Sequence, residues 1–241
     1  MRPVLHGWRE WVASAPIEMS SSLAVQRLPA DPNLPEPLRG AFVVHVRIAY
    51  AGPADEGARL IEPLRELAPI VMETVADQPY TQAATIHLDP PVPLPYFDRS
   101  IGLRELTADT VEALIDVAGP GTGCTLASIE IRALGGALDR EPRVPDAIPA
   151  RGLPYQLFAF GVGPRETADT NRAALAGVID RLRPWADERR MVSFLSPDEA
   201  GSQAEIAALY GRERYERLAR IKGVHDPANM FRVNHNIAPA S

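Results

Sequence analysis

The sequence predicts an α+β protein built on one broad, largely antiparallel sheet with helices on a single face. Residues 41–50 and 153–161 both have the period-two alternation of strands, and each is followed by a Gly-Pro pair that breaks it. A helical apolar stripe comes after each break, over residues 54–67 and 165–183. Units of this kind pack as a sheet that is covered by helices on one side.

Each further element follows from its local pattern. Alternation predicts strands, a stripe with a 3.6-residue period predicts helices, and clustered prolines and glycines mark loops. In chain order we predict a helix over 4–14, a strand over 20–28, a proline-rich loop over 29–37, a strand over 41–50, a helix over 54–67, a loop-rich stretch over 79–104, a helix over 107–117, strands over 123–134 and 153–161, and a helix over 165–183.

Two parts of this order resemble each other. Segments 49–53 and 160–164 both end a strand at a Gly-Pro pair, and the helix that follows each one stops at a Leu-Arg pair shortly before a proline. We therefore predict two related strand–strand–helix–strand units, followed by a carboxy-terminal helix and an extended tail.

Composition limits the kinds of protein that the chain can be. The net charge of −6 and the lack of a basic run argue against nucleic-acid binding. Cys124 is the single cysteine, so an internal disulfide and a cysteine-based zinc cluster are excluded. No apolar run has membrane length and the first residues lack a signal-peptide pattern, so we expect a cytoplasmic protein without a membrane partner.

A sheet with helices on one face leaves its other face for polar residues. The alternation places Ile129 and Ile131 toward the helices, so the side chains between and beside them lie on the open face. The predicted set on this open face is Gln26, His45, Arg47, Ser128, Glu130 and Arg132.

This polar face has two interpretations. It is either the solvated side of an ordinary antiparallel sheet or, if something covers it, the wall of a binding site. Glu130 is a candidate general base if burial raises its pKa. An ion pair with Arg132 or Arg47 would instead keep it ionised and structural.

Motifs for other chemistry are incomplete. The glycine-rich residues 119–123 precede a strand, so no helix amino terminus faces an anion there. Gly161 and Gly163 lie between a strand and a helix, but Glu166 stands where a dinucleotide fingerprint needs its third glycine. The five histidines lack metal-ligand spacing, and we expect Cys124 to be a small core residue.

The last 32 residues differ in kind from the rest. A helix is predicted to open at Tyr210 and end at Gly223, with Asp226 and a proline starting one further turn. The chain beyond it should be extended, with Asn234 and Asn236 on the same side. Such a tail either caps its own domain or presents two amides to a polar heterocycle.

This segment resembles the carboxy-terminal segment of berberine-bridge-enzyme-like FAD-linked oxidases. Upstream, the strand 129–139 resembles the Glu-Leu-Arg-x-Leu-Gly-Gly-Ala strand of bacterial members, and residues 11–40 are also similar. The matching positions near the end are Tyr210, Gly211, Tyr215, Arg217, Leu218, Ile221, Lys222, Asp226, Pro227, Asn229, Phe231, Arg232, Asn234, Asn236, Ile237 and Pro239.

The resemblance implies a substrate-binding half, residues 1–209, and a carboxy-terminal segment, 210–241, that packs on an FAD-binding domain or subunit absent from this chain. The polar face would be the roof of the active site, and Asn234 and Asn236 would lie near the FAD. The implied reaction oxidises a small alcohol, amine or sugar-like substrate by hydride transfer to flavin.

One stretch departs from the family. Met191 and Ser193 stand where the family's Tyr-x-Asn-Phe or Tyr-x-Asn-Tyr strand carries its substrate-facing tyrosine and asparagine. Met191 has no proton to give, so Glu130, Tyr155 or the substrate itself would have to take over. The alternative is a non-catalytic or relict binding module without flavin. In either case an uncovered sheet face predicts self-association of the isolated chain, for example as a homodimer.

Overall fold

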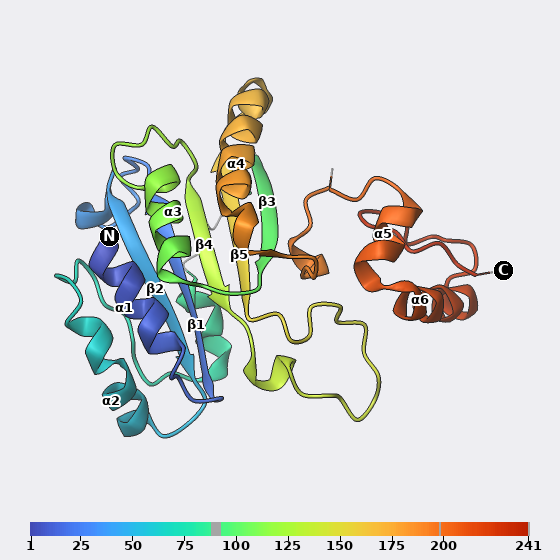
Figure 1. The fold of residues 1–241 in the computed structure, drawn as a ribbon, viewed down its shortest axis with the longest axis horizontal. Coiled ribbons are helices and arrows are strands. Elements are labelled where there is room, and N and C mark those ends of the chain that lie inside the picture. The colour runs from blue at the N-terminus through green and yellow to red at the C-terminus, as the bar shows by residue number, and fades with distance from the viewer. Residues whose placement is uncertain (88–92, 198, 241) are drawn as a thin grey trace.

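The computed structural model describes residues 1–87, 93–197 and 199–240, and it confirms the predicted antiparallel sheet. Six strands lie in the order β2-β1-β4-β5-β3-β6, and every neighbouring pair is antiparallel (Figure 1). The strands are β1 (Met19–Arg27), β2 (Phe42–Tyr50), β3 (Tyr96–Leu103), β4 (Ser128–Ala133), β5 (Tyr155–Val162) and β6 (Ala186–Asp187).

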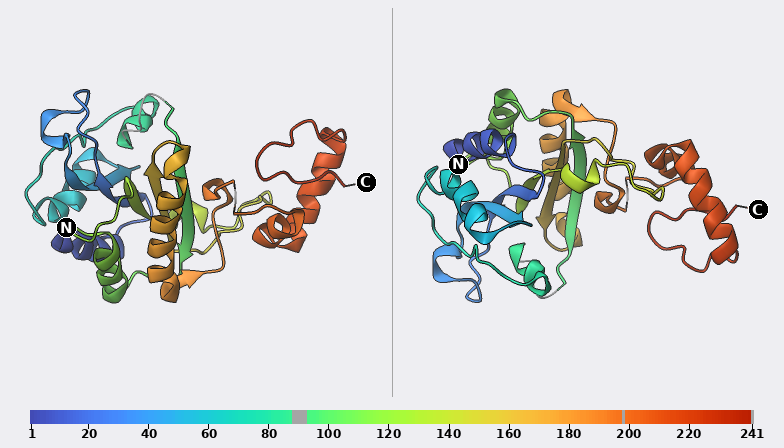
Figure 2. Two further views of the ribbon diagram at one scale, coloured as in Figure 1. Left: turned by 90° about the horizontal axis from the view of Figure 1, so that it is seen from above. Right: turned by 90° about the horizontal axis from the view of Figure 1, so that it is seen from below.

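Helices cover one face of this sheet, as the pattern predicts. Figure 2 shows α1, α3 and α4 on the same side, whereas the short 3-10 helix η2 (Tyr80–Ile86) lies on the other. The core between helices and sheet is apolar and includes Trp8, Leu114 and Leu157, all fully buried. The helices are α1 (Arg2–Val12), α2 (Ala54–Arg65), α3 (Ala108–Ala118), α4 (Ala168–Leu182), α5 (Gln203–Tyr210) and α6 (Arg212–His225). None of them, within the described residues, is long and apolar enough to cross a membrane.

The centre of the sheet joins two hairpins, β1–β2 and β4–β5, through the antiparallel pair β1–β4. The predicted breaks at 49–53 and 160–164 do fall at equivalent places, because β2 leads into α2 and β5 leads into α4. The second unit is completed by the two-residue strand β6. In the first unit, residues 66–87 form no strand, so the two units differ in their last element.

The loop-rich prediction for 79–104 is wrong in its second half, which contains β3. Phe97 and Ile101 of this strand pack on the core, but Asp98 and Ser100 on the opposite face are buried as well. A strand with both faces covered loses the apolar–polar contrast from which strands are recognised. Helix α5 was also not predicted; it begins at a capping box formed by Ser202 and Glu205.

The carboxy-terminal segment, which we define as residues 199–240, lies beside the sheet rather than on it (Figures 1 and 2). Its two helices α5 and α6 pack on each other. Hydrogen bonds link it to the body of the protein: Arg217 Nη1 donates to the carbonyl of Pro145 at 2.8 Å, and the ring of His235 lies 3.2 Å from the carbonyl of Leu195. The predicted boundary at 209/210 falls at the last residue of α5.

Helix α6 does not end at Gly223 as predicted but continues to His225. Gly223 is required for a different reason, since a Cβ atom there would lie 2.6 Å from the carbonyl oxygen of Ala240. The tail crosses α6 at this point, where the Ala240 amide donates to the carbonyl of Ala219 at 2.9 Å. The glycine therefore allows a close approach of the tail to the helix.

The tail agrees with the prediction only in part. The single turn predicted at Asp226 is present, because the Asn229 amide donates to the Asp226 carbonyl at 3.0 Å. The Asp226 carboxylate accepts the backbone amides of Met230 and Phe231 at 2.7 and 3.1 Å. Beyond it the chain is not regularly extended, because Asn234 adopts a left-handed conformation with φ 63°. The predicted two-residue alternation of Asn234 and Asn236 is thus broken at its first member.

Candidate functional site on the polar face

The pairing of the strands brings the predicted polar residues together on the face opposite α1, α3 and α4. Ser22 of β1 lies between Arg47 of β2 and Arg132 of β4 in the register of the sheet. The next row of the same face places His45 and Glu130 on either side of Ala24. This grouping follows directly from the period of two in all three strands.

Two of these charged side chains are removed from water. The side chains of Arg47 and Glu130 are only 7% and 6% exposed, so the interpretation as a solvated sheet is wrong for them. Arg47 Nη1 lies 2.9 Å from Glu130 Oε1, and Arg132 Nη2 lies 3.0 Å from Glu130 Oε2. We call Arg47, Glu130 and Arg132 the charged triad.

The pairing within the charged triad is incomplete. Arg47 and Glu130 are close but poorly aligned, so neither Arg47 Nη1 nor Glu130 Oε1 makes a hydrogen bond within the described residues. The Nε atoms of Arg47 and Arg132 are buried and lack a partner in the same part of the chain. Buried polar atoms are nearly always satisfied, so these atoms indicate a place for a bound polar group.

The charged triad fixes the ionisation of Glu130. Burial opposes the charged form, but attraction to Arg47 and Arg132 outweighs it and lowers the pKa of Glu130 below its ordinary value. The hypothesis of a general base with a raised pKa is therefore wrong in direction. Glu130 is ionised at neutral pH, and the interpretation as an ion-paired carboxylate is the correct one.

His45 stays neutral beside the triad. Burial of its ring, together with the positive charge of Arg47, lowers the pKa of His45 from 6.5 to about 4. His87, which follows η2, contributes in the same direction, whereas Glu130 opposes it. A neutral imidazole can both donate and accept a hydrogen bond at this position.

Aromatic rings border the charged triad on the side of β5. The Arg132 guanidinium lies over the ring of Phe194, 4.8 Å from its centroid. Phe158, paired with Glu130 across the sheet, makes an edge contact with Phe194 at 5.3 Å, and Phe160 continues the row. The site thus joins a charged half to an aromatic half.

The segment 188–197 covers the neighbouring strand β3 on the same face. Ser100 Oγ donates to the carbonyl of Phe194 at 2.7 Å, and Ser196 Oγ donates to Asp98 Oδ1 at 2.9 Å. Arg190 pairs with Glu199 and donates to the carbonyl of Ser100 at 2.8 Å. These contacts hold Phe194 in place over Arg132.

Three predicted substrate-facing residues lie elsewhere than expected. The predicted position of Tyr155 is wrong. This residue pairs with Ala133 and Leu103 on the helix-covered face, where burial raises the pKa of its hydroxyl. Met191 and Ser193 belong to a 3-10 turn and not to a strand. The Met191 amide donates to Gln156 Oε1 at 3.3 Å, and Ser193 is exposed.

The remaining predicted residues share the polar face or the tail. Gln26 lies on the face one row beyond His45, at the level of Ser128, and is partly buried. Asn236 is already engaged, because its Oδ1 accepts a hydrogen bond from Lys222 Nζ at 3.1 Å. Asn234 is exposed, and its side chain makes no hydrogen bond within the described residues.

Several residues of the site were not predicted. Ser22, Gln156, Phe158 and Phe194 line the same surface. The alternation of 153–161 carried the signal for Gln156 and Phe158, since their parity places them beside Arg132 and Glu130. Phe194 comes from an irregular segment, for which no periodic signal exists.

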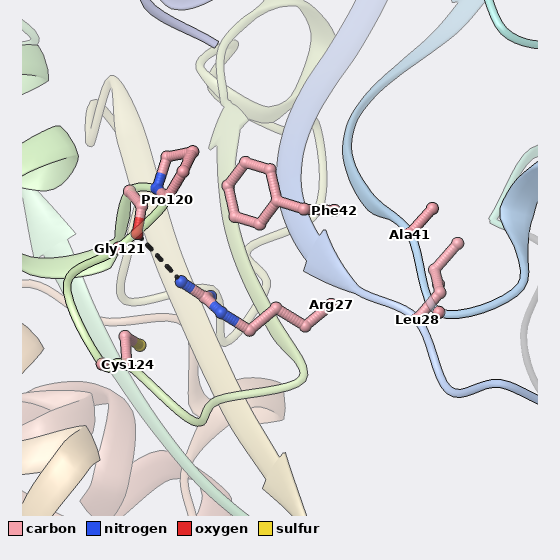
Figure 3. Close-up of a pocket in the computed structure, with 10 residues that line it drawn as sticks. Arg27, Leu28, Ala41, Phe42, Pro120, Gly121 and Cys124 are labelled. Atoms are coloured by element: carbon pink, nitrogen blue, oxygen red, sulfur yellow. Dashed lines mark hydrogen bonds between the residues drawn. The ribbon is translucent and has the colours of Figure 1, made fainter.

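A separate hollow of ≈ 490 Å³ lies at the other end of β1, away from the charged triad. Figure 3 shows Arg27 and Phe42 on one side of it and the loop 119–124 on the other. Arg27 Nη2 donates to the carbonyls of Ala118 and Gly119 at 2.6 and 3.3 Å, so this arginine caps the carboxyl end of α3. Cys124 is partly exposed there but also packs on the core.

The carboxy-terminal segment has a counterpart among known protein families. Residues 199–238 match the family model described as berberine and berberine like. An FAD-linked oxidoreductase of Dictyostelium discoideum is 28% identical over 207 residues, which cover 81% of this chain and 42% of that protein.

Solved structures agree in fold. They include wild-type BBE-like 1 of Physcomitrella patens (TM-score 0.70, 16% identity, 100% of this chain and 51% of that one) and 6-hydroxy-D-nicotine oxidase of Arthrobacter nicotinovorans (0.68, 20%, 99% and 51%). For xylooligosaccharide oxidase of Myceliophthora thermophila, in complex with xylobiose, the TM-score is 0.67 and the sequence identity is 19%. The match covers 100% of this chain and 52% of that one.

The chain therefore carries a berberine-like segment over residues 199–238 and shares the fold of berberine-bridge-like oxidases, in agreement with the resemblance seen in its sequence. It spans about half the length of these relatives. The similarity of the solved structures establishes the fold and nothing about the substrate.

Proposed function

We propose that this chain supplies the substrate-binding half of an FAD-dependent oxidoreductase, with the flavin held by a separate domain or subunit. The observation that carries the proposal is the charged triad, in which several buried donors and one buried acceptor make no hydrogen bond within the described residues. The boundary between the substrate-binding part and the carboxy-terminal segment lies near residue 199, where the family match begins.

The described residues fit a flavin as one wall of its site and not as its phosphate-binding part. The glycine pair at 161–163 forms no phosphate cradle, because the Thr167 side chain fills the space beside Gly163. The polar face, in contrast, offers unpaired donors to a polar ring edge or a substrate. In the tail, Asn234 is free for such a contact, whereas Asn236 is held by Lys222.

A bound FAD would supply the acceptor for the hydride that leaves the substrate. Glu130 Oε1 accepts a hydrogen bond from the substrate hydroxyl or amine and orients the carbon beside it. Arg47 and Arg132 stabilise negative charge that develops when this hydroxyl loses its proton. His45, neutral at pH 7, is the neighbouring group that can accept this proton on its unprotonated ring nitrogen and release the proton of the other ring nitrogen.

Flavin absorbance tests this proposal. The chain is purified alone and together with an FAD-binding domain of a berberine-bridge-like relative, and each sample is scanned for the flavin bands. We expect a yellow complex that bleaches anaerobically with a candidate alcohol, and a Glu130→Gln complex that keeps its flavin but bleaches at least tenfold more slowly. A stable complex that remains colourless would contradict the proposal.

A second candidate is a binding module without redox chemistry. It is favoured by Met191 and Ser193, because a thioether in a 3-10 turn cannot replace the tyrosine that the resemblance implies at this position. Under this alternative a colourless chain would still bind a small molecule at the charged triad. The same spectrum, followed by a ligand titration, separates the two functions.

A further inference from the structure

The charges of the polar face do not balance at the triad. Two guanidinium groups flank one carboxylate there, and His45 adds no charge at neutral pH. Within the described residues, Arg190, Glu199 and Asp98 are the further charged groups of this face, and they lie on or over β3 and outside the triad: Arg190 pairs with Glu199, and Asp98 accepts a hydrogen bond from Ser196. The triad itself therefore carries one excess positive charge, next to the water-shielded side chains of Arg47 and Glu130.

The excess charge also has free hydrogen-bonding capacity. Arg47 Nε and Nη1 and Arg132 Nε are buried and donate no hydrogen bond within the described residues. An arginine presents its donors as a planar fork, which matches the two oxygens of a carboxylate better than a single hydroxyl. Arg47 is more than nine-tenths buried and ion-paired only with Glu130 among the described residues, so its unused donors are best satisfied by an anion.

Aromatic rings occupy the adjacent surface. Phe158 and Phe194 meet edge to face beside Arg132, and Phe160 extends this surface toward Tyr96. These rings offer apolar contact area to the part of a ligand next to its charged group.

We infer that the ligand of the polar face is a small carboxylate with an apolar or aromatic portion, bound through Arg47 and Arg132 and packed against Phe158 and Phe194. This inference rests on the proposed function, for which it names the substrate class. Glu130 occupies the guanidinium groups in the free protein and competes with the incoming carboxylate. Its removal should therefore strengthen carboxylate binding, although it slows oxidation.

The test is calorimetric titration of the full chain with two probes of one shape, 3-phenylpropionate and its neutral counterpart 3-phenylpropan-1-ol. We expect the carboxylate to bind at least tenfold more tightly than the alcohol, as one charged hydrogen bond would give. Arg132→Gln should weaken carboxylate binding about tenfold and Glu130→Gln should strengthen it by a similar factor. Arg132→Gln should weaken binding of the alcohol much less than binding of the carboxylate, and Glu130→Gln should not strengthen binding of the alcohol, because Glu130 Oε1 accepts the hydrogen bond of a hydroxyl.

Arg181→Gln is the matched control, because it removes the same charge from the helix-covered side, where Arg181 pairs with Asp116. Arg132→Lys is a control for misfolding. It retains the positive charge without the planar guanidinium and should give an intermediate affinity for the carboxylate. Thermal unfolding confirms that each variant is folded.

Equal affinities for the two probes, no detectable carboxylate binding, or weaker carboxylate binding by Glu130→Gln would each overturn the inference. None of these readouts involves flavin. A yellow complex that oxidises only neutral substrates would thus contradict the carboxylate as ligand but support the oxidoreductase function. Carboxylate binding by a colourless complex would support the carboxylate as ligand but contradict the oxidoreductase function.

Discussion

The body of the protein and its carboxy-terminal segment bury their side chains very differently. In the body, the helices and the sheet enclose a continuous core, and even polar side chains such as Gln156 are fully buried. In the segment, α6 buries only Ala219, while the side chain of Phe231 is 78% exposed. The body is stabilised by its own core, whereas the segment leaves large apolar side chains exposed on its surface.

The largest expected effect concerns the core of the body. Trp8 is 1% exposed, and its ring nitrogen donates to Ser21 Oγ at 2.9 Å. We expect Trp8→Ala to lower the free energy of unfolding by about 3–5 kcal/mol in urea denaturation. Phe231→Ala removes another large aromatic side chain, but from the segment, and should change the free energy of unfolding by less than about 0.5 kcal/mol. Equal losses would show that the segment shares the core.

The charged triad offers the next largest effect. Arg47→Met leaves Glu130 buried with one guanidinium in place of two and should cost about 3 kcal/mol of unfolding free energy. The double variant Arg47→Met/Glu130→Gln also removes the buried carboxylate charge, so most of this loss should be recovered. A double variant as unstable as the single one would mean that packing, rather than charge, determines the cost.

Acid should reveal the neutral His45. Its pKa is about 4 in the folded protein and near 6.5 when unfolded, so the unfolded state binds more protons between these values. Stability is therefore complete above pH 6.5 and declines toward pH 4, by on the order of 2 kcal/mol once screening is allowed for.

Urea titrations at pH 7 and pH 4.5 check this dependence. His45→Asn should remove the decline between the two pH values, whereas the exposed His225→Gln should retain it. Because the pKa of Glu130 is lowered, its contribution is lost only at still lower pH and remains in both variants. An unchanged slope in His45→Asn would assign the decline to other groups.

The smallest change in stability belongs to the exposed surface of the segment, where the side chains of Val224, Met230, Phe231 and Val233 lie open to solvent. Phe231→Asp should leave the unfolding free energy nearly unchanged but weaken self-association of the isolated chain, measured by sedimentation velocity across a concentration series. If the wild-type chain stays monomeric at high concentration, the proposed homodimer is wrong.

The sequence predicted those elements in which one face is covered by helices and the other is polar. Strand β2 was recognised because His45 and Arg47 interrupt its apolar residues at every second position. Strand β3 escaped recognition because segment 188–197 buries its second face, a long-range contact without a local signal. The prediction of an extended tail failed because the backbone of Asn234 is in the left-handed conformation.

The sequence predicted which residues lie together in the candidate site better than it predicted their ionisation and pairing. Parity along the strands was sufficient to group Glu130 with Arg132 and Arg47. Whether Glu130 is a base with a raised pKa or an ion-paired carboxylate depends on distances near 3 Å between side chains of different strands. The hydroxyl of Tyr155 could take over the role of the missing tyrosine, but the parity of β5 assigns this side chain to the helix-covered face.

The pairing of β1 with β4, which we call the seam of the sheet, has a consequence for the rate of folding. Each flanking hairpin can form from residues near one another in the chain, but Ser22 meets Arg132 only after a long loop has closed. Such distant pairings are slow steps of folding. Because the seam lies between Arg47 and Glu130, we expect the charged triad to assemble late, so that no partly folded chain with separated hairpins displays a complete ligand site.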